Sequence, residues 1–203
     1  MKKKIFLAIF LIVSMAVPAF SYQWKGYDGH NKEDLKKFKE LVTKEFYLIR
    51  DEIFAPIYPE VKDVELVWDF REEDWKKTNS FYNNRIVRIK PYIDWDFLTE
   101  EKTLTIIHEL SHAVKHLVLN REGGGGHDKE FVEILYKMTD EFLIRVFDGT
   151  LKSYMFTDIS FFRTKEGIEM ISRFIENDSG VNAEKKDLTI SNLKKKLGLK
   201  ILR

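Results

Sequence analysis

The sequence predicts an α+β fold, and three observations support that class. Apolar residues recur at helical spacing in several long segments, two short segments alternate as strands do, and the strands come after the first helix and before the others. An order of helix, strands and then mainly helices is typical of an α+β layout. With 203 residues the chain is long enough for one domain with a large core, but too short for two comfortable ones.

The first half of the chain contains one predicted helix and two predicted strands. Apolar residues fall three and four positions apart from Asn31 to Phe54, which predicts a helix that Pro56 and Pro59 end. Residues 64–68 alternate like a strand, and residues 83–90 have the pattern of a second one. The charged segment between these strands is expected to form a loop or a hairpin.

The second half is predicted to be mainly helical. A long helix is expected from Thr99 to about Asn120, where the glycine run at residues 123–126 breaks it. A further helix is expected from about Asp128 to Phe147, followed by a loop and a possible strand over residues 151–162. One more helix is expected over residues 164–176.

The N-terminus has the pattern of a signal peptide. Three lysines at positions 2–4 precede a short apolar stretch over residues 5–17, and small residues offer cleavage after Ala19 or Ser21. A membrane-spanning helix needs about 20 apolar residues, and this run is shorter and ends in a proline. Residues 1–21 are therefore expected to be removed, which places the mature protein in the periplasm or outside the cell.

Composition and charge exclude several classes of protein. The chain has no cysteine, so disulfides, cysteine nucleophiles, thiolate zinc sites and a lipid anchor on cysteine are excluded. The formal charge of +1 falls to −2 when the three signal-peptide lysines leave, and much of the remaining positive charge lies after Lys185. The body of the protein is therefore acidic, which argues against nucleic-acid binding because that binding rests on phosphate neutralisation.

Residues 181–203 form a basic tail with two interpretations. Leucines and an isoleucine recur among the lysines from Leu188 onward, which predicts an amphipathic helix. Such a helix either packs its apolar stripe on the acidic body or contacts an anionic envelope polymer or membrane surface. Packing is favoured, because a helix with leucines at these spacings usually joins a core.

His108-Glu109-Leu110-Ser111-His112 is the segment that carries chemistry. Two histidines four residues apart on a helix project from the same face and can share one zinc ion. Glu109 can then reach a metal-bound water and take its proton. The alternative, surface histidines with no ligand role, fits less well because the segment lies in a strongly periodic helix. The helix also has a polar stripe suited to lining a cleft, made of Glu101, Thr105, His108, His112 and His116.

A catalytic zinc ion needs a third protein ligand, and several residues compete for that role. His116 lies about 12 Å along a straight helix from His108, too far to share one ion. Glu130 or Glu133 on the next helix is an alternative. His127 is favoured, because the glycine turn reverses the chain and presents it at the start of that helix, facing back toward the first.

These residues resemble the SprT-like (Spartan-type) zinc metallopeptidase family. His-Glu-Leu-Ser-His-Ala at 108–113 and Gly-His-x-x-Glu-Phe at 126–131 resemble the family's two motifs, with Asp128 where the family usually has glycine. The resemblance covers about residues 35–147. It implies a zincin-like metallopeptidase domain, with a small sheet and two active-site helices, within residues 22–180. It also implies that His108, His112 and His127 bind Zn²⁺, that Glu109 is the catalytic base, and that protein substrates are cleaved.

The expected function is therefore that of a secreted zinc-dependent endopeptidase, in which Glu109 assists attack of a zinc-bound water on a peptide bond. The expected partner is a protein or peptide, although many family members act inside cells on DNA-bound proteins. The alternatives are a non-catalytic module on a zincin fold and another zinc hydrolase, such as an amidase acting on cell-wall peptides. The oligomeric state is not indicated.

Two details of catalysis stay open. A side chain that stabilises the oxyanion is usually needed, and the residues available for it are Tyr82, Arg88, Tyr92 and Tyr136. The strand at residues 83–90 is either an edge strand, to which an extended peptide adds, or an ordinary internal strand.

Overall fold

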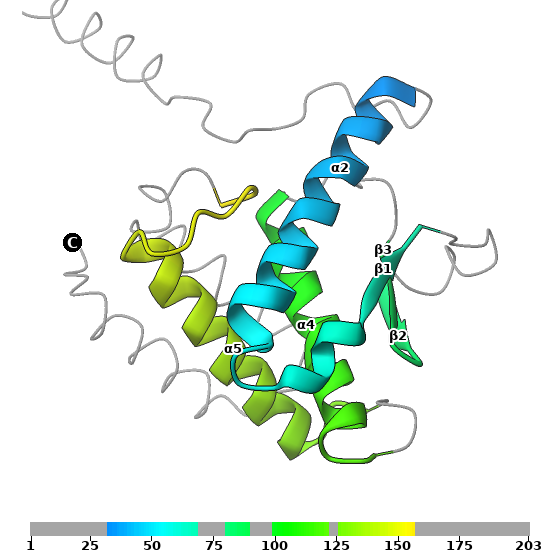
Figure 1. The fold of residues 1–203 in the computed structure, drawn as a ribbon, viewed down its shortest axis with the longest axis vertical. Helices are drawn as coiled ribbons and strands as arrows, with labels where there is room; N and C mark the ends of the chain where they lie inside the picture. Colours follow the sequence, from blue (N-terminus) through cyan, green and yellow to red (C-terminus); the bar gives the residue numbers. More distant parts are fainter. Residues whose placement is uncertain (1–31, 69–79, 90–98, 122–125, 157–203) are drawn as a thin grey trace, which may run out of the picture.

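Three long helices and a small sheet make up most of the part of the chain that the structure describes (Figure 1). The computed structural model describes residues 32–68, 80–89, 99–121 and 126–156. The helices are α2 (Lys32–Ile49), α4 (Thr99–Leu117) and α5 (Lys129–Phe147). Helix α4 packs against α5, against α2 and against strand β2 of the sheet, so it is the central element. The predicted α+β class is confirmed in this part of the chain.

Helix α2 confirms the first predicted helix. Its α-helical part is followed directly by a turn of π-helix, η1 (Arg50–Phe54), and the chain then bends before a short 3₁₀ helix, η2 (Pro59–Asp63). One proline lies in the bend, and the other occupies the first turn of η2, where its missing N–H costs nothing. Most of the apolar residues spaced three and four apart are buried, namely Phe38, Val42, Phe46, Ile49 and Ile53, whereas Leu35 and Leu41 are partly buried.

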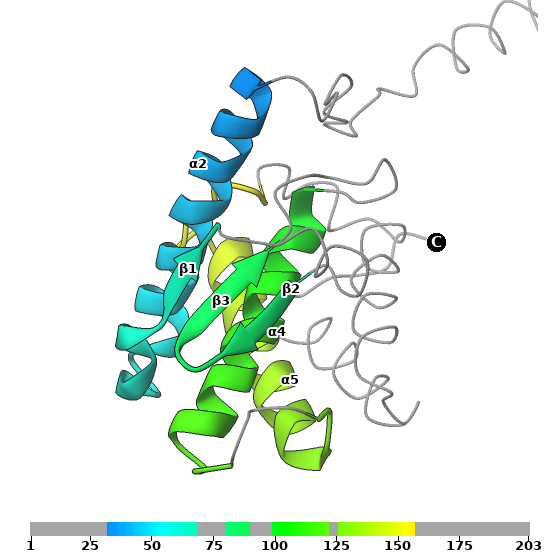
Figure 2. The same cartoon turned by 90° about the vertical axis from the view of Figure 1, so that its right-hand side faces the viewer.

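Among the described residues the sheet has three strands, β1 (Glu65–Val67), β2 (Ser80–Asn83) and β3 (Ile86–Ile89), in the order β1-β3-β2. Strands β1 and β3 are parallel, whereas β2 and β3 are antiparallel. Figure 2 shows the strands side by side in front of α4 and α5. The sheet thus forms one layer and the helices form the other.

The prediction of one continuous strand over residues 83–90 was wrong. The chain turns at Asn84 and Arg85, which both have positive φ, at 46° and 65°. Two such residues form the tight turn of a hairpin, and asparagine is among the residues that tolerate this conformation best. Residue 83 therefore belongs to β2, and β3 begins at Ile86. Since β3 has a neighbour on each side, it is an internal strand and not the edge strand that an added peptide would need.

Helix α4 ends earlier than predicted. It stops at Leu117, before the glycine run, and Asn120 then adopts a left-handed φ of 53°. The backbone N–H of Arg121 donates to the carbonyl of Lys115 at 3.5 Å, so the chain has already curled back on the helix. An asparagine in the left-handed region is a common way to end a helix. The glycines are therefore not what terminates α4.

Helix α5 has the predicted bounds to within one residue. Asp128 caps it, because its Oδ1 accepts the backbone N–H of Phe131 at 3.0 Å. The apolar residues of the predicted inner face are all buried: Phe131, Ile134, Leu135, Met138, Phe142 and Val146.

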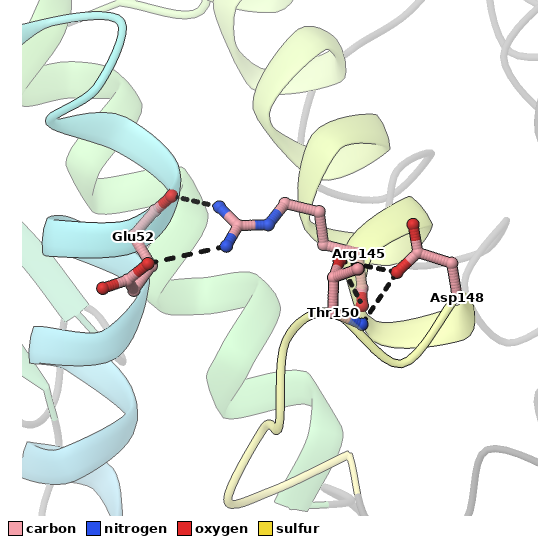
Figure 3. A network of polar contacts seen from close by, with 4 residues as sticks. All are labelled: Glu52, Arg145, Asp148 and Thr150. Carbon is pink, nitrogen blue, oxygen red and sulfur yellow. Dashed lines mark hydrogen bonds and ion pairs between the residues drawn. The ribbon is translucent and has the colours of Figure 1, made fainter.

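A polar network holds the far end of α5 to η1 (Figure 3). The Arg145 guanidinium donates to the Glu52 carbonyl and lies 3.5 Å from the Glu52 carboxylate. Asp148 accepts the backbone N–H of Thr150 at 2.9 Å, and the Thr150 hydroxyl donates to the Arg145 carbonyl at 3.3 Å. These contacts satisfy groups at the helix C-terminus that the helix itself leaves without partners.

The segment after α5 is hydrogen-bonded to a buried carboxylate of α2, that of Glu45. Glu45 accepts hydrogen bonds from the Ser153 hydroxyl at 2.5 Å, the Tyr154 backbone N–H at 2.7 Å and the Thr103 hydroxyl of α4 at 3.2 Å. Residues 151–156 are irregular, so the possible strand is not seen in that stretch, and residues 157–162 lie outside the described residues. Glu45 thus links α2, α4 and the segment after α5.

Glu45 makes the stability of the protein depend on pH. Burial raises the pKa of its carboxyl above the ordinary value of 4.5, against the lowering effect of the hydrogen bonds. The native state therefore holds this proton more tightly than the unfolded chain, and the stabilisation fades as pH rises through the raised pKa. Urea unfolding from about pH 4.5 to neutral should show the wild type losing stability relative to Glu45→Gln. A difference that stays constant over this pH range would contradict the expectation.

Several predicted features fall outside the described residues. They are the signal peptide at 1–21, the segment at 71–79, the helix at 164–176, the basic tail at 181–203 and Tyr92. Within the described residues, none of the helices combines the length and the apolarity that crossing a bilayer requires.

Candidate metal centre

The two histidines of α4 lie side by side on one face of the helix, as their spacing of four residues predicts. Their rings are 4.8 Å apart between centroids, and the Nε2 atoms of His108 and His112 are 3.1 Å apart. Zinc–nitrogen bonds of 2.0–2.1 Å in a tetrahedron separate two ligand nitrogens by about 3.3 Å. Both side chains are largely buried, at 6% and 9% exposed, so their positions are fixed by packing and not by solvent.

His127 approaches this pair from the chain just before α5. Its ring centroid is 4.9 Å from that of His108 and 5.2 Å from that of His112. One nitrogen from each of the three rings can be chosen so that all lie within 4.8 Å of one another. His127 is exposed, unlike the other two. The three histidines therefore form a group that could hold a metal ion, with one side open to solvent.

Phe131 in the first turn of α5 forms an apolar wall behind the group. Its ring lies 4.9, 4.2 and 4.8 Å from the rings of His108, His112 and His127 between centroids. The side chain is fully buried. The sequence pattern identified Phe131 as a core residue on the inner face of its helix, but gave no sign that it would contact all three imidazoles.

Lys115 of α4 holds the chain on both sides of His127. Its Nζ lies 2.7 Å from Oδ2 of Asp128 and donates to the carbonyl of Gly126 at 3.1 Å. The hydrogen bond from Lys115 is the main reason that the pKa of Asp128 is lowered, with the Phe131 backbone N–H adding to it. Asp128, which stands where the resembled family has glycine, therefore both caps α5 and binds a lysine.

Glu109, the expected catalytic base, is buried at 3% exposed and accepts a hydrogen bond from the sheet. Its Oε1 lies 2.6 Å from the Ser80 hydroxyl, at the start of β2. Sequence reasoning missed Ser80, because the segment between the predicted strands is expected to form a loop or a hairpin and gives no sign of a contact with Glu109. A carboxylate held by a hydroxyl beside two metal-ligand candidates is suited to receiving and passing on a proton.

The competing candidates for a third ligand lie elsewhere. Nδ1 of His116 is 2.8 Å from the Tyr82 hydroxyl, and the histidine is half-buried. Glu130 lies 3.3 Å from Arg121, and Glu133 is 3.7 Å from a lysine one turn away on the same helix. Among the described residues, no other group of three or more histidine or acidic side chains is suitably close for a metal ion.

The residues considered for oxyanion stabilisation have other neighbours. The Tyr82 hydroxyl, whose pKa is raised by burial, contacts His116 and accepts the Arg85 backbone N–H at 3.2 Å. The Arg88 guanidinium lies over the ring of Phe81, 5.3 Å from its centroid. Tyr136 is buried at 8% exposed on α5.

Comparisons of the chain with protein-family models, with curated proteins and with solved structures give no match. What the chain does is therefore inferred from its own residues and their arrangement. That arrangement brings three imidazoles together with one side open to solvent, and a buried carboxylate, Glu109, follows one of them directly in the sequence.

Proposed function

We propose that this chain is a zinc-dependent endopeptidase with a zincin-like, SprT-like architecture. The observation that carries the proposal is the convergence of His108, His112 and His127 within 4.8 Å, beside the buried carboxylate of Glu109. Helix α4 provides the first two histidines and the glutamate, and the chain just before α5 provides the third histidine.

Zinc is the metal that this set of donors favours. Three imidazole donors, with no further ligand in this group among the described residues, match a catalytic zinc site, which leaves a fourth position for water or substrate. When bound, zinc would supply Lewis acidity, polarising a scissile carbonyl and lowering the pKa of water toward about 7. The exposure of His127 supports access from solvent, whereas His108 and His112 are only 6% and 9% exposed.

Glu109 would move the proton in this reaction. As the residue next to His108 on a rigid helix, it is held close to the ligand group, and Ser80 fixes one carboxylate oxygen by a hydrogen bond of 2.6 Å. The carboxylate would take a proton from the attacking water and deliver it to the amine that leaves.

Strand β2 is the place where a peptide substrate would add to the protein. Within the described residues it is an edge of the sheet, paired on one side with β3, and its first residue contacts Glu109. An extended peptide lying along such an edge gains main-chain hydrogen bonds that do not depend on its sequence. This position would bring a peptide bond near the base and the histidines together.

Export and surface contacts belong to the same proposal. The signal-peptide pattern of residues 1–21 supports a location in the periplasm or outside the cell. Its substrate there would be a protein or peptide and not a nucleic-acid complex, and the basic tail at 181–203 would pack on the body or contact an anionic envelope surface. A non-catalytic module is disfavoured by the glutamate beside the histidines, whereas a cell-wall amidase would share the ligands and differ in the substrate.

Removal of the metal is the test of the proposal. The purified protein is expected to carry about one zinc ion per chain, to lose peptide-bond hydrolysis on treatment with a chelator, and to regain it when zinc is added back. The readouts are elemental analysis and cleavage of unfolded protein and of a broad peptide library. Zinc binding without any peptide cleavage would favour the binding module, and cleavage of cell-wall peptides alone would favour the amidase. Absence of zinc binding would refute the metal site.

A further inference from the structure

We propose that Lys115 positions the third metal ligand, His127, by clamping the chain on either side of it. This inference rests on the proposed metal site and adds a residue to it that touches neither metal nor substrate. Lys115 is therefore a positioning residue. Its substitution should change the affinity for the metal, and it should do so only when His127 is present.

One face of α4 carries both the ligands and the clamp. Lys115 follows His112 by three residues and His108 by seven, which are spacings that return to the same side of a helix. The first two side chains present nitrogens to the metal site, and the third reaches the turn that carries His127. Helix α4 thus sets the distance between His108 and His112 and, through Lys115, the position of His127.

The contacts of Lys115 bracket His127 in the sequence. The ammonium binds the carbonyl of Gly126 at 3.1 Å and the carboxylate of Asp128 at 2.7 Å, the residues immediately before and after the ligand. Two fixed points one residue on either side of His127 restrict where its Cα can lie. Asp128 is in turn fixed to the first turn of α5 through the N–H of Phe131.

The burial of Lys115 explains why its ammonium group holds the turn in place. Its side chain is 4% exposed, and a buried ammonium is costly unless oppositely charged or carbonyl groups surround it. Moving the turn away would strip the ammonium of both groups, so the turn is held in place. Gly126 has a φ of +96°, a backbone conformation that suits glycine and lets its carbonyl face the lysine.

A ligand on an exposed turn needs such a clamp more than a ligand on a helix does. His108 and His112 are ordered by α4 in the absence of metal, whereas His127 lies outside both helices and is exposed. Ordering a free turn on binding costs conformational entropy, which lowers the affinity for the metal. Groups that orient a ligand without touching the metal are typically worth about 10- to 100-fold in metal affinity.

The test replaces Lys115 with methionine, which keeps most of the side-chain length and removes the charge. Titration of the metal-free protein with Zn²⁺ against a competing chelator is expected to show about a 10- to 100-fold loss of affinity in Lys115→Met. Lys102→Met is the matched control, since Lys102 is a second buried lysine of α4, 4% exposed and before His108. It is expected to bind zinc as the wild type does.

A double-substitution cycle separates positioning from general damage to the fold. If Lys115 acts through His127, then Lys115→Met should have little further effect on zinc affinity in a His127→Ala background. An equal loss in both backgrounds would overturn the proposal, and so would a Lys115→Met protein with wild-type affinity. A wild type that binds no zinc would instead refute the metal site itself.

Asp128→Asn keeps the proposal testable if Lys115→Met does not fold. Asparagine caps a helix as well as aspartate does but removes the charge that pairs with Lys115. We expect a several-fold loss of zinc affinity that disappears in the His127→Ala background. Unchanged affinity in a folded Asp128→Asn protein would overturn the clamp.

Discussion

Glu109→Gln is expected to reduce peptide hydrolysis by at least about 100-fold while zinc stays bound, because a general base typically contributes 10²–10⁴-fold to the rate. Glutamine has nearly the shape of glutamate and can still accept the hydrogen bond from the Ser80 hydroxyl, which is 2.6 Å from Oε1 in the wild type. The loss would therefore reflect the missing proton acceptor. Rates on a peptide substrate and zinc content, measured on the same preparation, provide the two readouts.

Glu130→Gln is the matched control for this substitution. Glu130 is a carboxylate three residues after His127, and its partner is Arg121 at 3.3 Å. It should keep both zinc and activity, and a loss of zinc in this variant would instead support the glutamate-ligand alternative. Hydrolysis that persists in a zinc-loaded Glu109→Gln protein would rule out Glu109 as the base.

His127→Ala is expected to weaken zinc binding by about 10²- to 10³-fold while leaving the fold intact. Structural sites with four ligands bind zinc with about 10–16 kcal/mol, so one ligand accounts for roughly 3–4 kcal/mol, which is that factor in affinity. The fold should survive because His127 is exposed and lies outside both helices. Chelator competition gives the affinity, and circular dichroism of the metal-free protein checks the fold.

His116→Ala is the control for the loss of a histidine near the site. It removes the contact with the Tyr82 hydroxyl, 2.8 Å away, and should leave zinc affinity unchanged. A His127→Ala protein that retains wild-type affinity would show that the third ligand is another residue. Zinc lost only from His116→Ala would reverse the assignment.

The helices were predictable because the apolar residues that they bury recur at helical spacing in the sequence. In α5, six apolar residues at spacings of three and four all turned out to be buried, and Asp128 marked where the helix begins. The hairpin was not predictable in the same way, because β2 and β3 have four residues each and differ little in pattern from one longer strand. Two adjacent asparagines at 83 and 84 are the turn signal in this segment, but the strand-like pattern around them hides it.

The candidate site was predictable to the extent that it is local. His108, Glu109 and His112 share one helix, and the reversal of the chain before α5 brings His127 back to them over a short distance. The side chains that hold these groups could not be predicted from the sequence. Ser80 is 29 residues from Glu109 in sequence, so only the packing of the sheet on α4 brings the two together. Lys115 resembled any other lysine of a helix, since its burial depends on elements that pack around it.

The burial of α4 also affects how this protein can change during evolution. A helix that contacts α2, α5 and β2 contributes its apolar residues to the core and its histidines to the metal group. Ile107 and Leu110 are both fully buried and adjoin His108 and Glu109 in the sequence. A substitution that changes the side-chain volume at either position would therefore move the reactive groups as well. Such positions tolerate substitution chiefly when a facing residue changes with them. Variation between lineages should therefore gather on the exposed faces of α2 and α5, while α4 changes slowly and in concert with its neighbours.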